Sequence, residues 1–354
     1  MRFCESHKQS TTGLKVGALR DLTACFGYAQ ATTVIGVTTV QTVGEIGEFA
    51  LIDAISQRLR SADPALVSVG IGDDSAVVAA QGNQVVACVD MLTQGVHFRL
   101  DWSSANDVGR KAAAQNLADI FAMGATPTAL LVGLALPRTT PVSWVLELAD
   151  GLSQEAESVG VTVVGGDIVR ADHIMISVTA LGQLEGRSPI LRSGALVGDV
   201  VAVAGRLGFA AAGLLMLQRG FRSPRALVSA HRVPTPPYAL ARGAVAAHAM
   251  IDVSDGLISD LGHIARSSNV AIEISASAFD IPEDLSSAAA AFSGDAMEWI
   301  LTGGEDHAFV ATFADGLAVP SGWTIVGTVT DNAVGVWVDG QLRSGGGWDH
   351  FGNA

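Results

Sequence analysis

The chain has 354 residues, of which 49% are apolar and 16% are charged. This length and composition predict a globular protein with one long domain or two ordinary ones. The net charge of −14 at pH 7 argues against a protein that binds the phosphates of nucleic acid, although metal ions can reverse the local sign for an anionic substrate. No apolar run reaches the roughly 18 residues that cross a bilayer. Neither nucleic acid nor a membrane is therefore expected as a partner.

The three cysteines, Cys4, Cys25 and Cys88, are too few and too scattered for a disulfide framework or a thiolate zinc site. A reducing, cytoplasmic location fits this usage best. Residues 1–43 are mixed in character, without the apolar core of a secretory signal. We leave them as an unassigned N-terminal extension for which disorder is the expectation.

Regular structure is predicted from Gly44 on. Phe49, Ile52, Ile55 and Leu59 recur at helical spacing and predict a helix over 44–59. The segment NQVVACVDML then predicts a buried strand that ends at Asp90.

A long helix is predicted within SSANDVGRKAAAQNLADIFAMGA. Ser104 and Asp107 have the spacing of a capping box at its start, and Gly124 marks its end. Strands and a helix alternate through the rest of this half, as in an α/β unit. The predicted strands are 127–137, 161–170 with a Gly-Gly-Asp turn at 165–167, and 173–184, and the helix is 141–160.

The segment EGRSPILRSGALVGD, residues 185–199, interrupts this alternation with Gly, Pro and Ser. It is the predicted boundary between an N-terminal domain over 44–184 and a C-terminal domain over 185–354. Beyond it the order restarts with strands at 199–205 and 270–275, a helix at 209–220, and a strand, acidic turn and helix within 249–268. The predicted fold class is α/β (α+β) with two domains.

Six acidic clusters share one context, at the end of a predicted strand or on the helix that follows. They are Asp73-Asp74, Asp90, Asp119, Asp167, Asp252 with Asp255, and GGEDH at 303–307. Each alone is an ordinary turn residue, but strand ends in an α/β sheet converge on the edge where ligands bind. Two carboxylates about 4 Å apart repel by roughly 4 kcal/mol at an effective dielectric of 20, so such a cluster needs cations. Oxygen ligands of this kind predict Mg²⁺ with nucleotide phosphates, and hence phosphoryl transfer.

The sequence alone leaves the roles of three basic residues open: Lys111, Arg192 and His97. Lys111, Gln115 and Asp119, with Asn116, form a polar stripe on the long helix, which is either a solvated face or part of the site. Lys111 is the only lysine after position 15, and it either meets a phosphate or pairs with Asp107. Arg192, in the boundary segment, is either a surface arginine or a bidentate phosphate contact. His97, taken alone, is most simply structural.

Common nucleotide-binding and hydrolase motifs are missing. The sequence has no G-x-x-x-x-G-K-[ST] loop, no G-x-G-x-x-G after a strand, no G-x-S-x-G elbow and no protein-kinase motif set. If ATP is used, it is held without the common glycine cradle.

An ordered set of motifs resembles thiamine-monophosphate kinase. The set comprises GEFALI, GIGDDSAVV, VDMLTQGVHF, NLADIFAMGATP, GGDIVR, LRSGALVGD, IDVSDGLISDLGHIA, LTGGEDHAF and the closing GGGWDHF, and it covers residues 44–351. The resemblance implies a two-domain fold like that of aminoimidazole ribonucleotide synthetase and a homodimer whose N-terminal domains pair. It also implies transfer of the ATP γ-phosphate to thiamine monophosphate, giving thiamine diphosphate, with several Mg²⁺ ions.

The resemblance also implies roles for residues at matching positions, without a covalent phospho-enzyme. It implies Mg²⁺ ligands at Asp74, Asp90, Asp119, Asp167 and Asp252, a further ion at Asp255, and ATP contacts at Gly166, Asp167, Arg192 and Ser254. Thiamine contacts are implied at His97, Glu305 and Trp348. An acceptor phosphate oxygen is already anionic and needs no general base, so catalysis rests on charge neutralisation and positioning.

Two departures from the family pattern bear on the site. Cys88 and Val89 stand where the family usually has Ser-Thr before Asp90, so a hydroxyl metal ligand is lost and backbone carbonyls remain. His307-Ala308 replaces the commoner Tyr-Glu, which changes the substrate pocket.

Two other functions are compatible with parts of the sequence. One is another enzyme of the same fold, such as a selenophosphate synthetase, but neither Cys4 nor Cys25 has the glycine loop and lysine that it requires. The other is a Mg²⁺- or nucleotide-binding module without turnover.

Overall fold

A computed structural model describes residues 41–59, 63, 65–69, 71, 76–80, 82 and 84–343. All of them belong to one compact unit that begins at Val40. The helices are α1 (Val43–Ile46), α2 (Glu48–Ser56), α3 (Ala105–Ala122), α4 (Val142–Ser158), α5 (Phe209–Gln218), α6 (Arg225–Arg232), α7 (Tyr238–Gly243), α8 (Leu257–Ser268), η2 (Ala276–Ala278), α9 (Glu283–Phe292) and α10 (Ala296–Thr302). The strands are β1 (Val67–Val69), β2 (Val77–Val78), β3 (Val86–Thr93), β4 (Thr126–Leu136), β5 (Val163–Arg170), β6 (Met175–Gln183), β7 (Val200–Ala204), β8 (Ala249–Val253), β9 (Ala271–Ile274), β10 (Ala308–Phe313), β11 (Thr324–Thr330), β12 (Gly335–Val338) and β13 (Gln341–Arg343).

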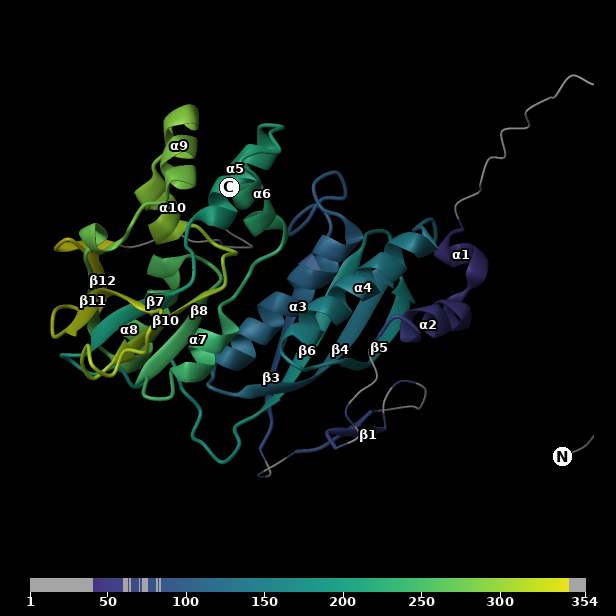
Figure 1. The fold of residues 1–354 in the computed structure, drawn as a ribbon, viewed down its shortest axis with the longest axis horizontal. Helices are drawn as coiled ribbons and strands as arrows, with labels where there is room; N and C mark the ends of the chain where they lie inside the picture. Colours follow the sequence, from purple (N-terminus) through teal and green to yellow (C-terminus); the bar gives the residue numbers. More distant parts are fainter. Residues whose placement is uncertain are drawn as a thin grey trace, which may run out of the picture. The chain divides into compact units, whose positions relative to one another are not determined.

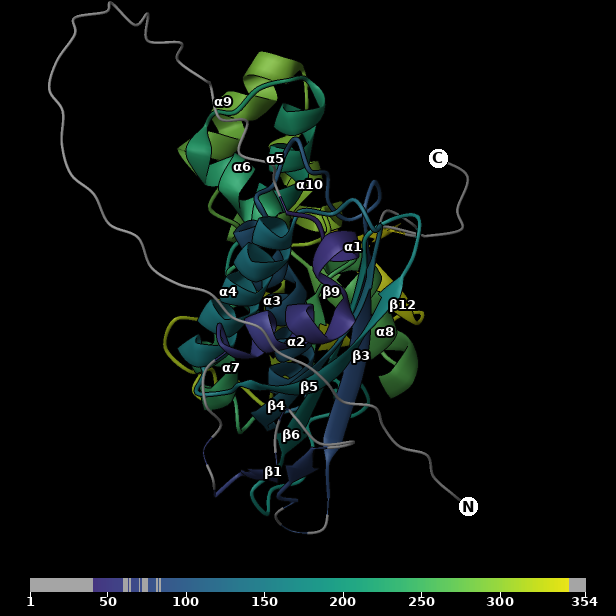
Figure 2. The same cartoon turned by 90° about the vertical axis from the view of Figure 1, so that its right-hand side faces the viewer.

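The first half of the described chain is built on a four-stranded sheet in the order β3-β6-β4-β5 (Figure 1). Strand β6 runs antiparallel to both β3 and β4, and β5 runs parallel to β4. Helices α3 and α4 lie together on one face of this sheet (Figure 2). Apolar side chains from these helices and from β4 and β6 form the core between the two layers.

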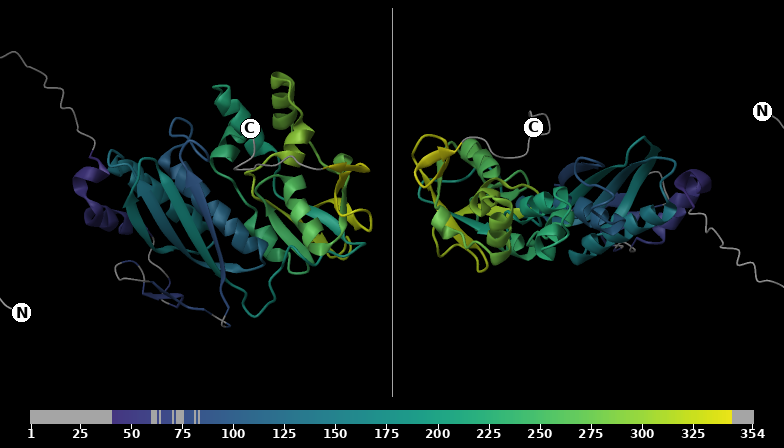
Figure 3. Two further views of the ribbon diagram at one scale, coloured as in Figure 1. Left: turned by 180° about the vertical axis from the view of Figure 1, so that it is seen from behind. Right: turned by 90° about the horizontal axis from the view of Figure 1, so that it is seen from above.

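The opposite face of this sheet carries no helix in the part of the chain that the structure describes (Figure 3, left). Strands β1 and β2 pack against part of it, where Val67 contacts the cluster of Ala129 and Val164. Val89 and Met91 of β3 stay 59% and 48% exposed. We call this the open face of the four-stranded sheet.

Helix α3 begins where the sequence predicts. The Ser104 hydroxyl accepts from the backbone N–H of Asp107, and the Asp107 carboxylate accepts from the N–H of Ser104, which completes the capping box. Gly124 follows the helix end in the left-handed region, with φ +67°. Helices α3 and α4 approach so closely that a Cβ on Gly151 would lie 2.2 Å from the carbonyl oxygen of Asn106.

The second half is built on a seven-stranded sheet in the order β13-β12-β9-β11-β7-β10-β8. Its pairings are antiparallel except for that of β12 with β9. One face packs against α5, α6, α8 and α10. The other face packs against the end of α3, where Phe121 joins the cluster of Phe309 and Phe313. Helix α3 therefore contacts both sheets, and this places its polar residues between the two halves.

Three details of the predicted elements are wrong. The helix expected over 44–59 is divided at Gly47, whose φ of +78° is incompatible with a continuous helix. Strand β3 does not end at Asp90 but continues to Thr93. Residues 165–167 form no turn, because β5 runs unbroken through them to Arg170. Pairing of β5 with β4 keeps this stretch extended despite its two glycines.

Within the described residues, no helix combines the length and the apolarity that crossing a bilayer requires.

Candidate functional site

Three carboxylates from different elements influence one another's ionisation. Asp90 lies on β3, Asp119 on α3 and Asp252 on β8. Burial, together with the negative charges of Asp252 and Asp90, raises the pKa of Asp119 to about 7. Burial also raises the pKa of Asp90, with a smaller contribution from Asp252. We call these three residues the carboxylate cluster.

The packing of α3 between the two sheets explains how the cluster forms. Asp90 faces the helix layer, because it pairs in register with the buried Val178 of β6. Asp252 is near the end of β8, which contacts α3. Asp119 is in the last turn of α3 and is the only one of the three on a helix. The tertiary contact of α3 with β8 therefore assembles the cluster.

His307 contacts the cluster directly. Its Nδ1 lies 2.9 Å from Oδ2 of Asp252, and both side chains are almost fully buried. Burial alone would lower the pKa of His307, but its hydrogen bond to Asp252 and the charge of that residue raise it. Because β10 runs antiparallel to β8, the segment just before β10 lies beside the end of β8, with Ala308 opposite Val253. The GGEDH segment before β10 therefore lies beside Asp252 at the end of β8.

Cys88 lies behind the cluster and is not a reactive thiol. Its Sγ donates to the backbone carbonyl of Asn116 at 3.3 Å. Burial and the charge of Asp119 raise its pKa well above the usual range, so the thiol stays protonated. The side chain of Asn116 accepts from the N–H of Asp90 at 2.9 Å, which anchors β3 to α3. Val89 is the second of the two residues that stand in place of the family's usual Ser-Thr. It points to the open face and is 59% exposed.

The turn after β8 is held by Asp260. Its carboxylate accepts from the N–H groups of Asp255 and Gly256, both at 3.1 Å. Burial raises the pKa of Asp260 to about 8, with contributions from Asp252 and Asp255. The carbonyl of Ser254 accepts from the N–H of Glu305 at 2.7 Å, so this turn is joined to the GGEDH segment.

The cluster fits a hard divalent cation. Its carboxylates repel one another in a buried site, and a cation relieves that repulsion. No three carboxylate, imidazole or thiol groups of the described residues enclose one ion by themselves. Mg²⁺ at nucleotide sites is typically held by one or two carboxylates, with phosphate oxygens and water completing the shell. One or two of Asp90, Asp119 and Asp252 could supply that kind of partial shell.

Asp167 is not brought to the cluster within one chain. Asp90 pairs with Val178, Val178 with Val132, and Val132 with Gly166. Three strand spacings of about 4.8 Å put Gly166 roughly 14 Å from Asp90 across the sheet. Asp167, one residue on, points to the open face and is exposed. Its role and that of Gly166 stay predictions.

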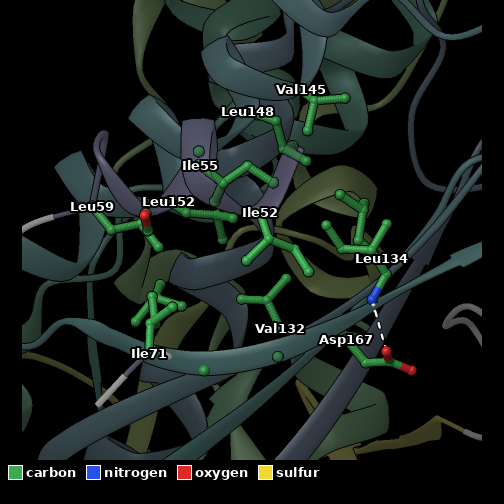
Figure 4. Close-up of a pocket in the computed structure, with 16 residues that line it drawn as sticks. Ile52, Ile55, Leu59, Ile71, Val132, Leu134, Val145, Leu148, Leu152 and Asp167 are labelled. Atoms are coloured by element: carbon green, nitrogen blue, oxygen red, sulfur yellow. Dashed lines mark hydrogen bonds between the residues drawn. The ribbon is translucent and has the colours of Figure 1, made fainter. Parts of the chain in front are cut away.

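A cavity of about 130 Å³ adjoins Gly166 on the helix side of the sheet. Figure 4 shows Ile52 and Ile55 of α2 and Leu148 and Leu152 of α4 around it, with Asp167 at one end. The lining is almost entirely apolar. Such a cavity suits a flat, weakly polar group better than a phosphate.

A second group of polar residues surrounds Glu305. Its Oε1 accepts from Lys111 Nζ at 2.8 Å, and its Oε2 lies 3.1 Å from Nδ1 of His231. Lys111 Nζ also donates to the backbone carbonyls of His97 at 3.1 Å and His231 at 3.3 Å. Burial alone would raise the pKa of Glu305, but the charge of Lys111 holds it well below its usual range. The two predicted thiamine contacts in the described chain, His97 and Glu305, are therefore joined through one lysine.

The interpretation of Lys111 as an exposed partner of Asp107 is wrong. Asp107 is engaged in the capping box, and Lys111 is buried, with 2% of its side chain exposed. Its three N–H groups already have acceptors. The stripe is likewise no solvated face, since Gln115 and Asn116 are buried.

The structure describes only some of the remaining residues that the resemblance implies in the site. The side chain of Arg192 is exposed, and its charge, like that of Asp255, acts on the pKa of His263 in α8. This puts Arg192 within electrostatic range of the helix that follows the acidic turn. Asp73, Asp74 and Trp348 lie outside the described residues.

Comparison with known proteins defines the class of protein first. Residues 72–184 match the family model "AIR synthase related protein, N-terminal domain", and residues 197–339 match "AIR synthase related protein, C-terminal domain". The two matches cover most of the chain, so this is a two-domain AIR synthase related protein.

Individual relatives narrow the class. Thiamine-monophosphate kinase of Mycobacterium tuberculosis (strain H37Rv) is 48% identical over 319 residues, which are 89% of this chain and 95% of that protein. The crystal structure of thiamine-monophosphate kinase from Stenotrophomonas maltophilia K279a is 35% identical, with a TM-score of 0.73 over 84% of this chain and 98% of that one. The structure of AaThiL complexed with AMPPCP and TMP is 33% identical, with a TM-score of 0.72 over 89% of this chain and 100% of that one. The chain belongs to the thiamine-monophosphate kinase family.

Sequence reasoning missed His231 and the structural use of Asn116. His231 carries no local signal, because its position depends on how α6 packs. Asn116 was visible on the polar stripe, but only the contact of α3 with β3 shows what it binds.

Proposed function

We propose that this protein is an ATP-dependent kinase that phosphorylates thiamine monophosphate to thiamine diphosphate, the last step in making that cofactor. The observation that carries the proposal is the family membership, at up to 48% identity over most of both chains. It is supported by the neighbour that was crystallised with AMPPCP, an ATP analogue, and TMP.

The reaction is a direct in-line transfer. An oxygen of the acceptor phosphate forms a bond to the γ-phosphorus of ATP, the bond from that phosphorus to the β–γ bridging oxygen breaks, and ADP leaves. The attacking oxygen is already anionic, so the site needs no general base. The chain's task is to hold two anionic groups in line and to balance their charge.

We propose that Mg²⁺ ions bind at Asp90, Asp119 and Asp252, with Asp74, Asp167 and Asp255 as further ligands. When bound, the ions neutralise charge on the phosphates and polarise the γ-phosphoryl group. His307 holds Asp252, and Asp260 holds the turn that carries Asp255. The carbonyls of Cys88 and Val89 remain candidates for the same site.

We propose that ATP contacts Gly166, Asp167, Arg192 and Ser254, with its base in the apolar cavity beside Gly166. Apolar walls from α2 and α4 suit the faces of an adenine ring. Ala149→Phe should fill part of this cavity and raise the KM for ATP. A KM for ATP equal to that of the wild type would place the base elsewhere.

We propose that the protein is a homodimer that pairs through the open face of its four-stranded sheet. Val89, Met91 and Val169 are apolar, exposed and on that face. The proposed domains, 44–184 and 185–354, are supported by the two family models matched at 72–184 and 197–339. A cytoplasmic location is supported by the sparse, scattered cysteines.

The deciding experiment incubates the pure protein with ATP, Mg²⁺ and thiamine monophosphate and measures thiamine diphosphate. Product in proportion to enzyme supports the kinase. A folded protein that makes no product at any Mg²⁺ concentration would contradict it and favour a binding module. Selenide-dependent release of phosphate from ATP would favour the selenophosphate synthetase alternative.

A further inference from the structure

Lys111 is a buried cation between the two halves of the chain. It lies on α3, and 2% of its side chain is exposed. Its Nζ donates to Glu305 Oε1 at 2.8 Å, to the carbonyl of His97 at 3.1 Å and to the carbonyl of His231 at 3.3 Å. An ammonium group has three donors, so the described contacts use all of them. Lys111 is therefore committed to protein groups and not to a phosphate.

These three acceptors come from separate parts of the chain. His97 is in the loop after β3, His231 is in the last turn of α6, and Glu305 is in the segment before β10. Lys111 thus joins three segments of the chain. His97 is 14 positions from Lys111, His231 is 120 positions away and Glu305 is 194 positions away.

Glu305 is held from every side. Its backbone is in the left-handed region, with φ +66°, and its N–H donates to the carbonyl of Ser254 at 2.7 Å. Lys111 binds one carboxylate oxygen, and Nδ1 of His231 lies 3.1 Å from the other. Trp102 packs edge-on against His231, with ring centroids 6.2 Å apart. Even so, 31% of the Glu305 side chain remains exposed.

We propose that Lys111 is a positioning residue that assembles the acceptor site by orienting Glu305 and the His97 loop, the two described segments at which the resemblance implies thiamine contacts. This rests on the proposed function, in which thiamine monophosphate is the acceptor. Nδ1 of His231 lies next to the other oxygen of the same carboxylate. The prediction separates the two substrates, because ATP does not need this carboxylate.

A double-mutant cycle tests the proposal with Lys111→Met, Glu305→Gln and the double variant. For each, calorimetry measures the Kd of thiamine monophosphate without ATP, and steady-state kinetics measure the KM of both substrates. We expect Lys111→Met to weaken binding of thiamine monophosphate roughly tenfold or more while the KM for ATP changes less than about twofold. In the Glu305→Gln background, Lys111→Met should add little, because the residue that it orients is already altered.

Arg110→Met is the matched control. Arg110 is the neighbouring cation on α3, and its Nε and Nη2 donate to Glu155 at 3.1 and 3.0 Å, away from Glu305. This variant should lower the melting temperature and leave the Kd of thiamine monophosphate unchanged. If Lys111→Met behaves in the same way, or if its effect adds fully to that of Glu305→Gln, Lys111 is only structural and the proposal fails.

If Lys111→Met does not fold, His231→Phe provides the second test. His231→Phe should raise the KM for thiamine monophosphate and leave the KM for ATP unchanged. A KM for thiamine monophosphate equal to that of the wild type would overturn the proposal. Failure of the proposed function gives a different result, since the wild type would then make no thiamine diphosphate.

Discussion

Asp119 is a buried carboxylate whose neighbours, Asp90 and Asp252, are also carboxylates. Burial and those two charges raise its pKa to about 7. Like charges held together in a buried site destabilise the fold unless a cation or a proton intervenes. The cluster therefore lowers the stability of the fold when no cation is present.

We predict that Asp119→Asn stabilises the metal-free protein and disables the enzyme. The amide removes one of three repelling charges, so the melting temperature without Mg²⁺ should rise or stay level. Removal of a proposed metal ligand should lower the turnover of thiamine monophosphate by about 10²-fold or more. Calorimetry and a product assay measure the two effects, with Asp331→Asn, an exposed carboxylate, as the control. Wild-type turnover in Asp119→Asn would remove this residue from the metal site.

At the scale of the element, helix α5 begins on a buried carboxylate. Asp306 accepts from the N–H of Gly208 at 2.6 Å and from that of Ala210 at 2.8 Å. These are orphan donors at a helix start, which a carboxylate satisfies well. Burial nevertheless raises the pKa of Asp306 to about 7.

The raised pKa of Asp306 predicts that the stability of the fold decreases as the pH rises. The native state binds the Asp306 proton more tightly than the unfolded state, whose pKa is near 3.8. The resulting stability is complete below about pH 4 and is lost as the pH rises through about 7. Asp306→Asn has no such proton, so the melting temperature of the wild type should fall more than that of the variant between pH 5 and pH 8. Parallel pH profiles for the two proteins would assign the dependence to other groups.

Close contact between α3 and α4 gives a second prediction at this scale. A Cβ on Gly151 would lie 2.2 Å from the carbonyl oxygen of Asn106, and backbone cannot swing aside as a side chain can. Gly151→Ala should therefore destabilise the protein by about 1–3 kcal/mol, measured by denaturant unfolding. Gly243→Ala is the control, since a Cβ there meets nothing within 4 Å. Equal losses in the two variants would mean that the helices separate freely.

At the scale of the whole molecule, the two sheets differ in how their faces are covered. The seven-stranded sheet packs against helices on one face and against α3 and α7 on the other. The four-stranded sheet has α3 and α4 on one face, while β1 and β2 cover only part of the other among the described residues. On the uncovered part of this face, Val89 and Met91 are exposed and apolar. A second copy of the chain would bury this surface.

We predict that Val89→Asp converts the proposed dimer to a monomer. A carboxylate in the centre of a paired apolar face cannot be desolvated without a partner. Sedimentation velocity on both proteins measures the change, with Val245→Asp, at a position that is 65% exposed away from this face, as the control. A wild-type protein that sediments as a monomer would contradict the dimer, and a dimeric Val89→Asp would place its interface elsewhere.

Much of the N-terminal half could be predicted from the sequence. The start of α3 at Ser104 and its end before Gly124 follow from local rules, because a capping box and a left-handed glycine act within a few residues. The ends of β3 and β5 could not be found in this way. Asp90 and Asp167 read as turn residues, but pairing along neighbouring strands keeps both extended.

By itself the sequence determined the family, and its acidic side chains, with their oxygen donors, predicted a site for a hard cation. Only the tertiary structure decided which of them meet. Asp119 joins Asp90 and Asp252 because α3 packs between two sheets, whereas the four-stranded sheet holds Asp167 on the opposite face. Lys111 shows the same division most clearly. Its sequence neighbours offered a solvated stripe, but long-range packing buries it and gives all three of its donors to protein groups. Contacts between distant segments depend on the energy of the whole core, which no local pattern encodes.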